Sequence, residues 1–223
     1  MLGWTDSING ISGLRRTRVK VCGITRSEDA RDAVGLGVDA LGLVFYPPSA
    51  RYLSPGEAAH LVRGLPPFVT TVGLFLDPEP GFVNEVLERV PLDLLQFHGR
   101  ESPAQCEQAG RPYIKAIAMG GGADPEEQAR RFASARGLLV DSHVAGAPGG
   151  SGRRFDWRAV GSLPDGPPLI LAGGLTPENV GEAIRVVRPW AVDVSSGVED
   201  SPGLKSPVMM RRFMEAVADA DDR

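Results

Sequence analysis

The sequence predicts an α/β protein, a single (β/α)8 TIM barrel with parallel strands, on three observations. The chain has 223 residues, which suits one barrel, because eight βα units need roughly 200 residues or more. Short apolar runs alternate along the chain with amphipathic, charged runs, which is the pattern of a parallel sheet connected by helices. Polar residues and glycines follow the apolar runs, at the strand ends where a barrel carries its active site.

The predicted strands are apolar and mostly β-branched, as is typical of parallel strands that are covered on both faces. At this chain length, so many strands favour a closed barrel over an open sheet. No G-x-G-x-x-G motif follows the first strand, which argues against a dinucleotide-binding fold. The predicted strands are Arg18–Cys22, Asp39–Phe45, Thr70–Phe75, Asp93–Phe97, Tyr113–Ala118, Leu138–Asp141, Leu169–Leu171 and Ala191–Val194.

Helices are predicted in the amphipathic segments that follow the strands. Ser27 is the start signal of the first helix, and Ser54, Ser102, Asp124 and Thr176 each precede a proline. Such a pair marks a helix start, because proline is favoured at the first helical position. The predicted helices are Ser27–Leu36, Pro55–Arg63, Gly81–Arg89, Pro103–Ala109, Pro125–Ala135, Trp157–Ser162, Pro177–Val187 and Ser206–Ala218.

The domain organisation and setting follow from composition. Residues 1–16 are rich in Gly, Ser and Asn and predict a loosely ordered N-terminal extension. Residues 17–223 are expected to form one (β/α)8-barrel domain, the catalytic one if the chain is an enzyme. The net charge of −4 comes without a long basic block, so we expect no nucleic-acid partner. No apolar run approaches the ~18 residues of a membrane span, and no secretory signal is expected. Two isolated cysteines, of which Cys106 falls in a predicted helix, favour the cytoplasm. Nothing in the sequence indicates a partner protein.

Two titratable residues at the ends of predicted strands, Cys22 and Asp141, are the candidate base and acid. A thiolate can take a proton from carbon, and a carboxylic acid can protonate a sugar oxygen. A lone cysteine is more often a small buried hydrophobe, and an acid can instead cap a helix, but both positions favour catalysis. Strand alternation puts Lys20 on the face of Cys22, where its charge is expected to favour the thiolate. Pairing of Lys20 with Asp193, on the neighbouring last strand, would dilute that effect.

Two glycine-containing loops predict a phosphate site. Gly173-Gly174 ends the seventh predicted strand ahead of a helix expected near Pro177, and Ser195-Ser196-Gly197 follows the eighth. Glycine lets backbone amides approach a phosphate, and a helix N-terminus favours its negative charge. A pair of tight turns is the alternative, but phosphate sites after strands seven and eight are frequent in this fold.

His98 and Arg51 each allow two interpretations. No second histidine or acid stands near His98 at metal-ligand spacing, so neither a metal nor any other cofactor is expected. His98 is therefore either a substrate contact or a hydrogen-bonded residue of the strand end. Arg51 lies in the proline-stiffened loop 47–52. It forms either a surface salt bridge or a bidentate clamp on a substrate carboxylate.

The motifs around these residues resemble the phosphoribosylanthranilate isomerase family. The resemblance runs from about Arg18 to the end of the chain, and the N-terminal extension is unmatched. Phe97 stands where the family often has leucine, and the loop 141–149 is locally variable. The motifs are Lys20-Val-Cys-Gly-Ile-Thr25, Phe45-Tyr-Pro-Pro-Ser-Ala-Arg-Tyr-Leu-Ser-Pro55, Leu94-Leu-Gln-Phe-His-Gly99, Leu138-Leu-Val-Asp-Ser142 with Gly149-Gly-Ser-Gly152, Leu171-Ala-Gly-Gly-Leu-Thr-Pro-Glu-Asn179 and Val192-Asp-Val-Ser-Ser-Gly-Val-Glu199.

The resemblance implies an aldose–ketose isomerase of tryptophan biosynthesis. Its reaction would be the Amadori rearrangement of N-(5-phosphoribosyl)anthranilate to 1-(2-carboxyphenylamino)-1-deoxyribulose 5-phosphate, a small-molecule phosphoribosyl substrate, with no cofactor. The resemblance implies Cys22 as general base, Asp141 as general acid and phosphate at the loops Gly173-Gly174 and Ser195-Ser196-Gly197. The expected substrate-binding side chains are Lys20, His98, Asp193 and, on the anthranilate carboxylate, Arg51.

Three other functions compete with this interpretation. A histidine-pathway phosphoribosyl aminoaldose isomerase, or an enzyme acting on both substrates, is similar in fold but carries an aspartate at the end of strand one, where this chain has Cys22. A non-catalytic phosphosugar-binding barrel would not need both Cys22 and Asp141. A redox or metal protein fits poorly with two isolated cysteines and three scattered histidines.

Overall fold

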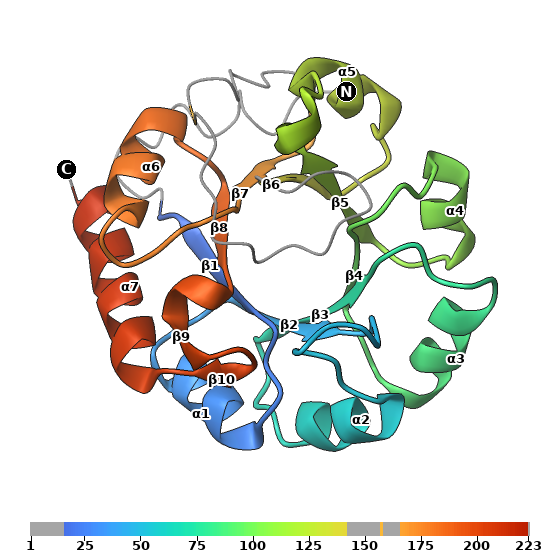
Figure 1. Ribbon diagram of the computed structural model, residues 1–223, viewed down its shortest axis with the longest axis horizontal. Coiled ribbons are helices and arrows are strands. Elements are labelled where there is room, and N and C mark those ends of the chain that lie inside the picture. Colours follow the sequence, from blue (N-terminus) through green and yellow to red (C-terminus); the bar gives the residue numbers. More distant parts are fainter. Residues whose placement is uncertain (1–15, 142–156, 158–165, 223) are drawn as a thin grey trace.

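The computed structural model describes residues 16–141, 157 and 166–222 and has the predicted closed barrel of parallel strands (Figure 1). Each strand pairs with the next along the chain, and the barrel closes where the last strand pairs with the first, with Lys20 opposite Asp193. The predicted strand bounds are correct to within one residue at each end. The strands are β1 (Arg18–Cys22), β2 (Ala40–Val44), β3 (Thr70–Phe75), β4 (Leu94–Phe97), β5 (Tyr113–Ala118), β6 (Gly137–Asp141), β7 (Leu169–Leu171) and β8 (Ala191–Val194).

The helices form an outer ring around this barrel (Figure 1). The predicted helix Trp157–Ser162 lies outside the described residues except for Trp157, and the predicted N-terminal extension lies outside them except for Arg16. The helices are α1 (Ser27–Gly35), α2 (Pro55–Arg63), α3 (Phe82–Arg89), α4 (Pro103–Gln108), α5 (Pro125–Arg131), α6 (Val180–Val187) and α7 (Pro207–Asp221).

The predicted capping residues are confirmed at three positions and wrong at two, although α1 does begin at the predicted Ser27. Ser54 and Ser102 each form a full capping box, and the Asp124 side chain accepts a hydrogen bond from the second residue of α5. Ser27 is already the first helical residue of α1, after an extended Arg26 that makes no side-chain cap. Thr176 also does not cap α6, which begins at Val180. Because α6 begins late, the loop after β7 extends to Asn179.

A short hairpin after β8 was not predicted. It consists of β9 (Glu199–Ser201) and β10 (Leu204–Lys205), which pair antiparallel after the 3-10 turn η3 (Ser196–Val198). Strands of two or three residues give no alternation pattern that sequence reasoning can read. In Figure 1 the hairpin lies near α1, and its Lys205 contacts the carbonyls of Cys22 at the end of β1 and of Ser195 just after β8, so the hairpin packs against these strand ends.

The barrel interior is filled from one side by a small apolar cluster, built around Ile114, Leu139, Ile170 and Ala191. Because side chains alternate along a strand, residues two positions beyond Leu139 and Ala191 also point inward. These are Asp141 and Asp193.

Thr17 donates to Asp221 through its backbone N–H and its hydroxyl, both at 2.6 Å, which fastens the start of the barrel to α7. Within the described ranges, every helix falls short of the length and apolar character that a membrane span requires.

Candidate active site

The carboxyl ends of the strands surround a pocket that gathers the residues predicted from the sequence. Every predicted site residue lines this pocket except Lys20, which lies beneath it and pairs with Asp193. The predicted motif at residues 149–152 lies outside the described residues. The predicted residues in the pocket are Cys22, Arg51, His98, Asp141, Gly173, Gly174, Asp193, Ser195, Ser196 and Gly197.

Cys22 is the last residue of β1 and is buried at the base of the pocket. It lies beside Gly42 of β2, its register partner. A side-chain carbon added at Gly42 would lie 2.7 Å from the Cys22 sulfur, so the thiol occupies space that only a glycine leaves. The Cys22 carbonyl accepts hydrogen bonds from the Ser195 hydroxyl at 3.0 Å and from the Lys205 ammonium at 2.6 Å. The strand end that carries the thiol is therefore fixed from two sides.

Burial outweighs the expected lowering of the Cys22 pKa by Lys20, although that lowering is present and Lys20 pairs with Asp193 as expected. Lys20 donates to both oxygens of Asp193 at 2.9 Å, and this pair is buried. Asp193 and the thiol hold the pKa of Lys20 above its ordinary value in spite of its burial. Burial raises the pKa of the Cys22 thiol, and the lowering by Lys20 does not reverse this, since Asp193 opposes it. Cys22 is therefore protonated over most of the neutral range and is a strong base once deprotonated.

Asp141 ends β6 as predicted and faces His98, which follows β4. The nearest ring nitrogen of His98, Nε2, lies 3.9 Å from Oδ2 of Asp141, and both side chains are buried. The amide nitrogen of Gln96 lies 3.2 Å from Nδ1 of His98. With the amide as donor, the ring proton lies on Nε2 and faces Asp141. A buried acid beside a polar ring suits a group that gives and regains a proton.

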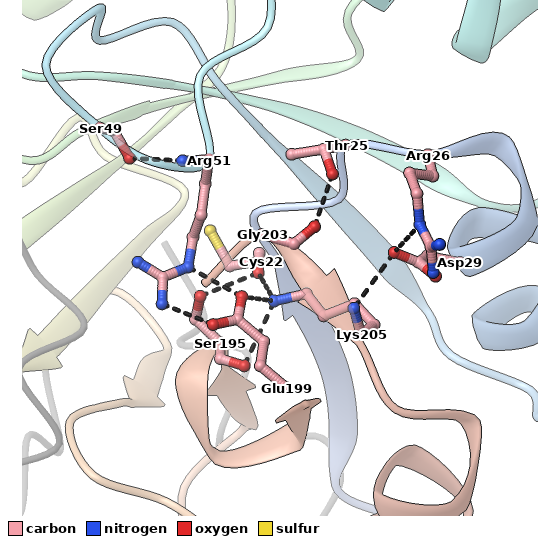
Figure 2. Close-up of polar contacts among 10 residues, drawn as sticks. All are labelled: Cys22, Thr25, Arg26, Asp29, Ser49, Arg51, Ser195, Glu199, Gly203 and Lys205. Carbon is pink, nitrogen blue, oxygen red and sulfur yellow. Dashed lines mark hydrogen bonds and ion pairs between the residues drawn. The ribbon is translucent and has the colours of Figure 1, made fainter. Parts of the chain in front are cut away.

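Arg51 forms a salt bridge, as one of its two interpretations expected, but the bridge to Glu199 is largely buried and does not lie on the surface. Nε donates to one oxygen of Glu199 at 2.8 Å and Nη2 to the other at 2.6 Å. The pairing raises the pKa of Arg51 and, together with Lys205, keeps the pKa of Glu199 below its usual range despite burial. Among the described residues Nη1 has no partner, and Arg51 lines the pocket (Figure 2). The guanidinium is thus pre-oriented and keeps donors for an anion.

The loop after β7 exposes backbone to the pocket. Gly173 and Gly174 have φ of 85° and 67°, a left-handed conformation that glycine adopts without strain. Asn179 holds this loop: its carbonyl accepts from Thr176 N at 2.9 Å, and its amide donates to the Gly174 carbonyl at 2.9 Å. This bracing explains why α6 begins three residues beyond the predicted Pro177, at Val180.

The loop after β8 packs directly against the first one. A side-chain carbon at Gly197 would overlap the carbonyl of Leu175, so the two glycine-containing loops touch at this point. Ser195, Ser196 and Gly197 all line the pocket beside Gly174. The contact unites the two loops into one concave surface of backbone and hydroxyl groups, which suits an oxyanion.

The opposite side of the pocket, toward β2 and β3, is largely apolar. Val44, Leu74 and Leu76 line it together with Tyr46, and Arg51 lies at its edge. A flat aromatic ring bearing a carboxylate matches an apolar wall with one guanidinium at the rim. The backbone surface of the two loops and the apolar wall therefore lie on either side of Cys22.

Sequence reasoning missed four residues that shape this site. Glu199 and Asn179 were quoted within motifs without a role, and a buried carboxylate or amide carries no local signal of its partner. Gln96 is fully buried in the middle of β4, where a polar residue in an apolar run was a readable signal. Lys205 gave no signal, because a lysine near a chain's last helix is ordinarily solvated.

Two further features bear on the site's chemistry. Cys106 lies on α4, away from the pocket, and burial raises the pKa of its thiol to about 12. It is therefore a structural residue, as expected. Within the described part of the chain, no group of three His, Cys, Asp or Glu side chains could hold a metal ion.

Comparisons with known proteins agree with this geometry. The family model described as N-(5'-phosphoribosyl)anthranilate (PRA) isomerase matches residues 19–216. The N-(5'-phosphoribosyl)anthranilate isomerase of Nitrosococcus oceani is 55% identical over 202 residues, which cover 91% of this chain and 98% of that protein. The enzyme of the same name from Thiobacillus denitrificans is 56% identical over 198 residues, covering 88% and 96%.

Solved structures are similar over the same part of the chain. The phosphoribosyl anthranilate isomerase of Thermotoga maritima has a TM-score of 0.80 at 42% identity, covering 91% of this chain and 99% of that one. A phosphoribosyl anthranilate isomerase crystallised with reduced 1-(o-carboxyphenylamino)-1-deoxyribulose 5-phosphate has a TM-score of 0.78 at 40% identity, with the same coverage.

Proposed function

This chain belongs to the N-(5'-phosphoribosyl)anthranilate isomerase family, and we propose from its pocket how it isomerises its substrate. The reaction is the Amadori rearrangement of N-(5-phosphoribosyl)anthranilate to 1-(2-carboxyphenylamino)-1-deoxyribulose 5-phosphate. The observation that carries the proposal is that Cys22 and Asp141 line one pocket with two phosphate-suited loops and an arginine. The two cysteines are free thiols, which supports a cytoplasmic setting for the reaction.

The order of strands around the barrel supports one orientation of the substrate. The loops after β7 and β8 suit the phosphate, and Arg51, after β2, suits the anthranilate carboxylate. Because β1 lies between β8 and β2 in the closed barrel, the ribose would lie over Cys22. The aromatic ring would then rest on the wall formed by Val44, Leu74 and Leu76.

In the first step Asp141 acts as the general acid. Its carboxyl group gives a proton to the ribose ring oxygen while the bond between C1′ and that oxygen breaks. The anthranilate nitrogen supplies its lone pair to C1′, which yields a protonated Schiff base. His98, 3.9 Å from Asp141, supports the acid by offering a polar neighbour inside a buried site.

In the second step Cys22 acts as the general base. Its thiolate takes the proton from C2′, and the electrons of that bond pass to the nitrogen and form an enolamine. The enolamine becomes the ketone when the C2′ hydroxyl loses its proton and C1′ gains one. Burial raises the pKa of the thiol, so the thiolate is the minor form at neutral pH but a strong base, which suits removal of a proton from carbon.

Arg51→Ala is expected to weaken ligands that carry the anthranilate carboxylate and to spare simple phosphosugars. Loss of a charged hydrogen bond is worth ~1.5–3 kcal/mol, which corresponds to roughly a tenfold to a hundredfold weaker affinity. Inhibition constants of a product analogue and of ribose 5-phosphate measure the two effects. An unchanged constant for the product analogue would limit Arg51 to its pairing with Glu199.

Gly174→Ala is expected to raise KM for the phosphorylated substrate. Alanine is strained at the φ of 67° that Gly174 adopts, by roughly 1–2 kcal/mol, so the loop relaxes and its amide moves. The control is a substrate analogue without phosphate, whose KM should change little. Equal effects on both substrates would make this glycine structural. Gly197 is unsuitable for the test, since a larger residue there would separate the two loops.

The function itself is tested with freshly made phosphoribosylanthranilate, whose anthranilate fluorescence decays as the product forms. Purified protein is expected to accelerate this decay and to yield the aminoketose, identified by mass spectrometry and by its reaction as a ketone. No acceleration over buffer, with folded protein, would overturn the proposal. Acceleration on the histidine-pathway aminoaldose as well would extend the substrate range to both compounds.

A further inference from the structure

Lys205, on the unpredicted hairpin, is fully buried and points at the site from behind Cys22 (Figure 2). Its ammonium lies 2.6 Å from the Cys22 carbonyl, 3.2 Å from the Ser195 carbonyl and 2.7 Å from Oε1 of Glu199. We propose that Lys205 is a positioning residue that fastens the strand carrying the base to the loop that binds phosphate. This inference rests on the proposed function in taking Cys22 as the base and the loop after β8 as part of the phosphate site.

The geometry of the three contacts favours positioning over simple charge pairing. An ammonium group has three donors, and Lys205 has one acceptor for each. Two of the acceptors are backbone carbonyls, one at the end of β1 and one at the end of β8. A residue that served only to neutralise Glu199 would not need them, because Arg51 already pairs with that carboxylate through two hydrogen bonds.

The hairpin that carries Lys205 is itself fastened to the loop after β1 and to the first turn of α1. The Thr25 hydroxyl donates to the Gly203 carbonyl at 2.6 Å, and the Lys205 N–H donates to Asp29 at 3.2 Å (Figure 2). The side chain therefore enters the site from an anchored backbone. An anchored donor holds its acceptors in place, and an error of about 1 Å in a reacting group can lower the rate by a factor on the order of 10².

The buried charges connect the three parts of the substrate site. Glu199 accepts hydrogen bonds from Arg51 on one side and from Lys205 on the other. Arg51 is the expected carboxylate clamp, and Lys205 contacts the base strand and the phosphate loop. The positive charge of Lys205 also lowers the pKa of the Cys22 thiol, against the raising effect of burial. Removing Lys205 should therefore both loosen the alignment and make the thiolate rarer.

The test compares Lys205→Met with Lys115→Met. Lys115 is the matched control, because it is also buried and also has three acceptors: the Phe97 and Gly99 carbonyls at 3.2 and 2.7 Å and Glu101 at 3.0 Å. Both variants lose a buried ammonium, so both are expected to unfold at lower urea concentration. Only Lys205 contacts Cys22 and Ser195.

Two readouts separate positioning from stability. The first is the pH dependence of Cys22 alkylation by iodoacetamide, with the modified residue mapped by mass spectrometry. We expect Lys205→Met to move this profile to higher pH and Lys115→Met to leave it at the wild-type position. The second is kcat/KM, measured under conditions in which each variant is fully folded. Lys205→Met should lower kcat/KM by about tenfold or more.

Lys205→Arg separates the charge from the geometry. It keeps a cation, so the alkylation profile should lie nearer to that of the wild type, but its planar guanidinium cannot place one nitrogen against three oxygens. Its kcat/KM should still fall. This variant also carries the test if Lys205→Met does not fold.

Wild-type alkylation profiles and wild-type kcat/KM in the folded Lys205 variants would overturn the inference. That result differs from a failure of the proposed function, in which Cys22→Ser itself would keep wild-type turnover. If Cys22→Ser is inactive and the Lys205 variants are unchanged, Cys22 remains the base and only the positioning role of Lys205 is contradicted.

Discussion

Cys22→Ser is expected to lower kcat by a factor on the order of 10³ or more, at the upper part of the range for general acid–base catalysis. A serine hydroxyl is a far weaker acid than a thiol, so almost no alkoxide exists at neutral pH to remove the C2′ proton. The substitution keeps the shape of the side chain beside Gly42. Substrate binding should therefore change little, and the measurement is kcat and KM from the fluorescence decay.

Cys106→Ser is the matched control for this substitution. Cys106 is completely buried on α4 and does not line the pocket, so its replacement can lower stability but should leave kcat near the wild-type value. Iodoacetamide should inactivate the wild-type enzyme through Cys22, and a bound product analogue should slow the inactivation. Full activity of Cys22→Ser, or inactivation that follows Cys106, would assign the base to another residue.

Asp141→Asn is expected to lower kcat by about 10²-fold or more, with a smaller change in KM. The amide keeps the size and polarity of the carboxyl group but has no proton to transfer to the ribose ring oxygen. Asp39→Asn is the control, because Asp39 lies at the amino-terminal end of the barrel, where it accepts from Val19 N at 2.8 Å. That variant should lose stability rather than turnover. Turnover near the wild-type value in Asp141→Asn would remove this residue from the mechanism.

The barrel could be predicted because its signals are local. Strands such as Tyr113–Ala118 are short apolar runs, and capping residues such as Ser54 and Ser102 stand directly before prolines. The strand ends then indicate where polar side chains meet, which led to Cys22 and Asp141. The hairpin that follows β8 was missed, because its strands are too short to show a period.

The pairing of Lys20 with Asp193 could be predicted, because the two residues lie on adjacent strands. The other charged contacts and the net direction of the Cys22 pKa could not, because they depend on burial and on distant parts of the chain. Lys20 was correctly placed beside Cys22, but the direction of the thiol pKa is set by burial, which spacing along a strand does not reveal. Glu199 and Lys205 become parts of the site only when the hairpin folds back onto β1. Their contacts join residues up to 183 positions apart in the sequence.

The most direct test of the central claim, that Asp141 serves ring opening and Cys22 serves proton removal from carbon, uses substrate deuterated at C2′. The C2′–H bond breaks only in the second step, so deuterium should slow the residual turnover of Cys22→Ser, in which that step limits the rate. It should leave the residual turnover of Asp141→Asn unchanged, since ring opening then limits the rate. A deuterium effect in Asp141→Asn together with none in Cys22→Ser would contradict this division of roles between the two residues.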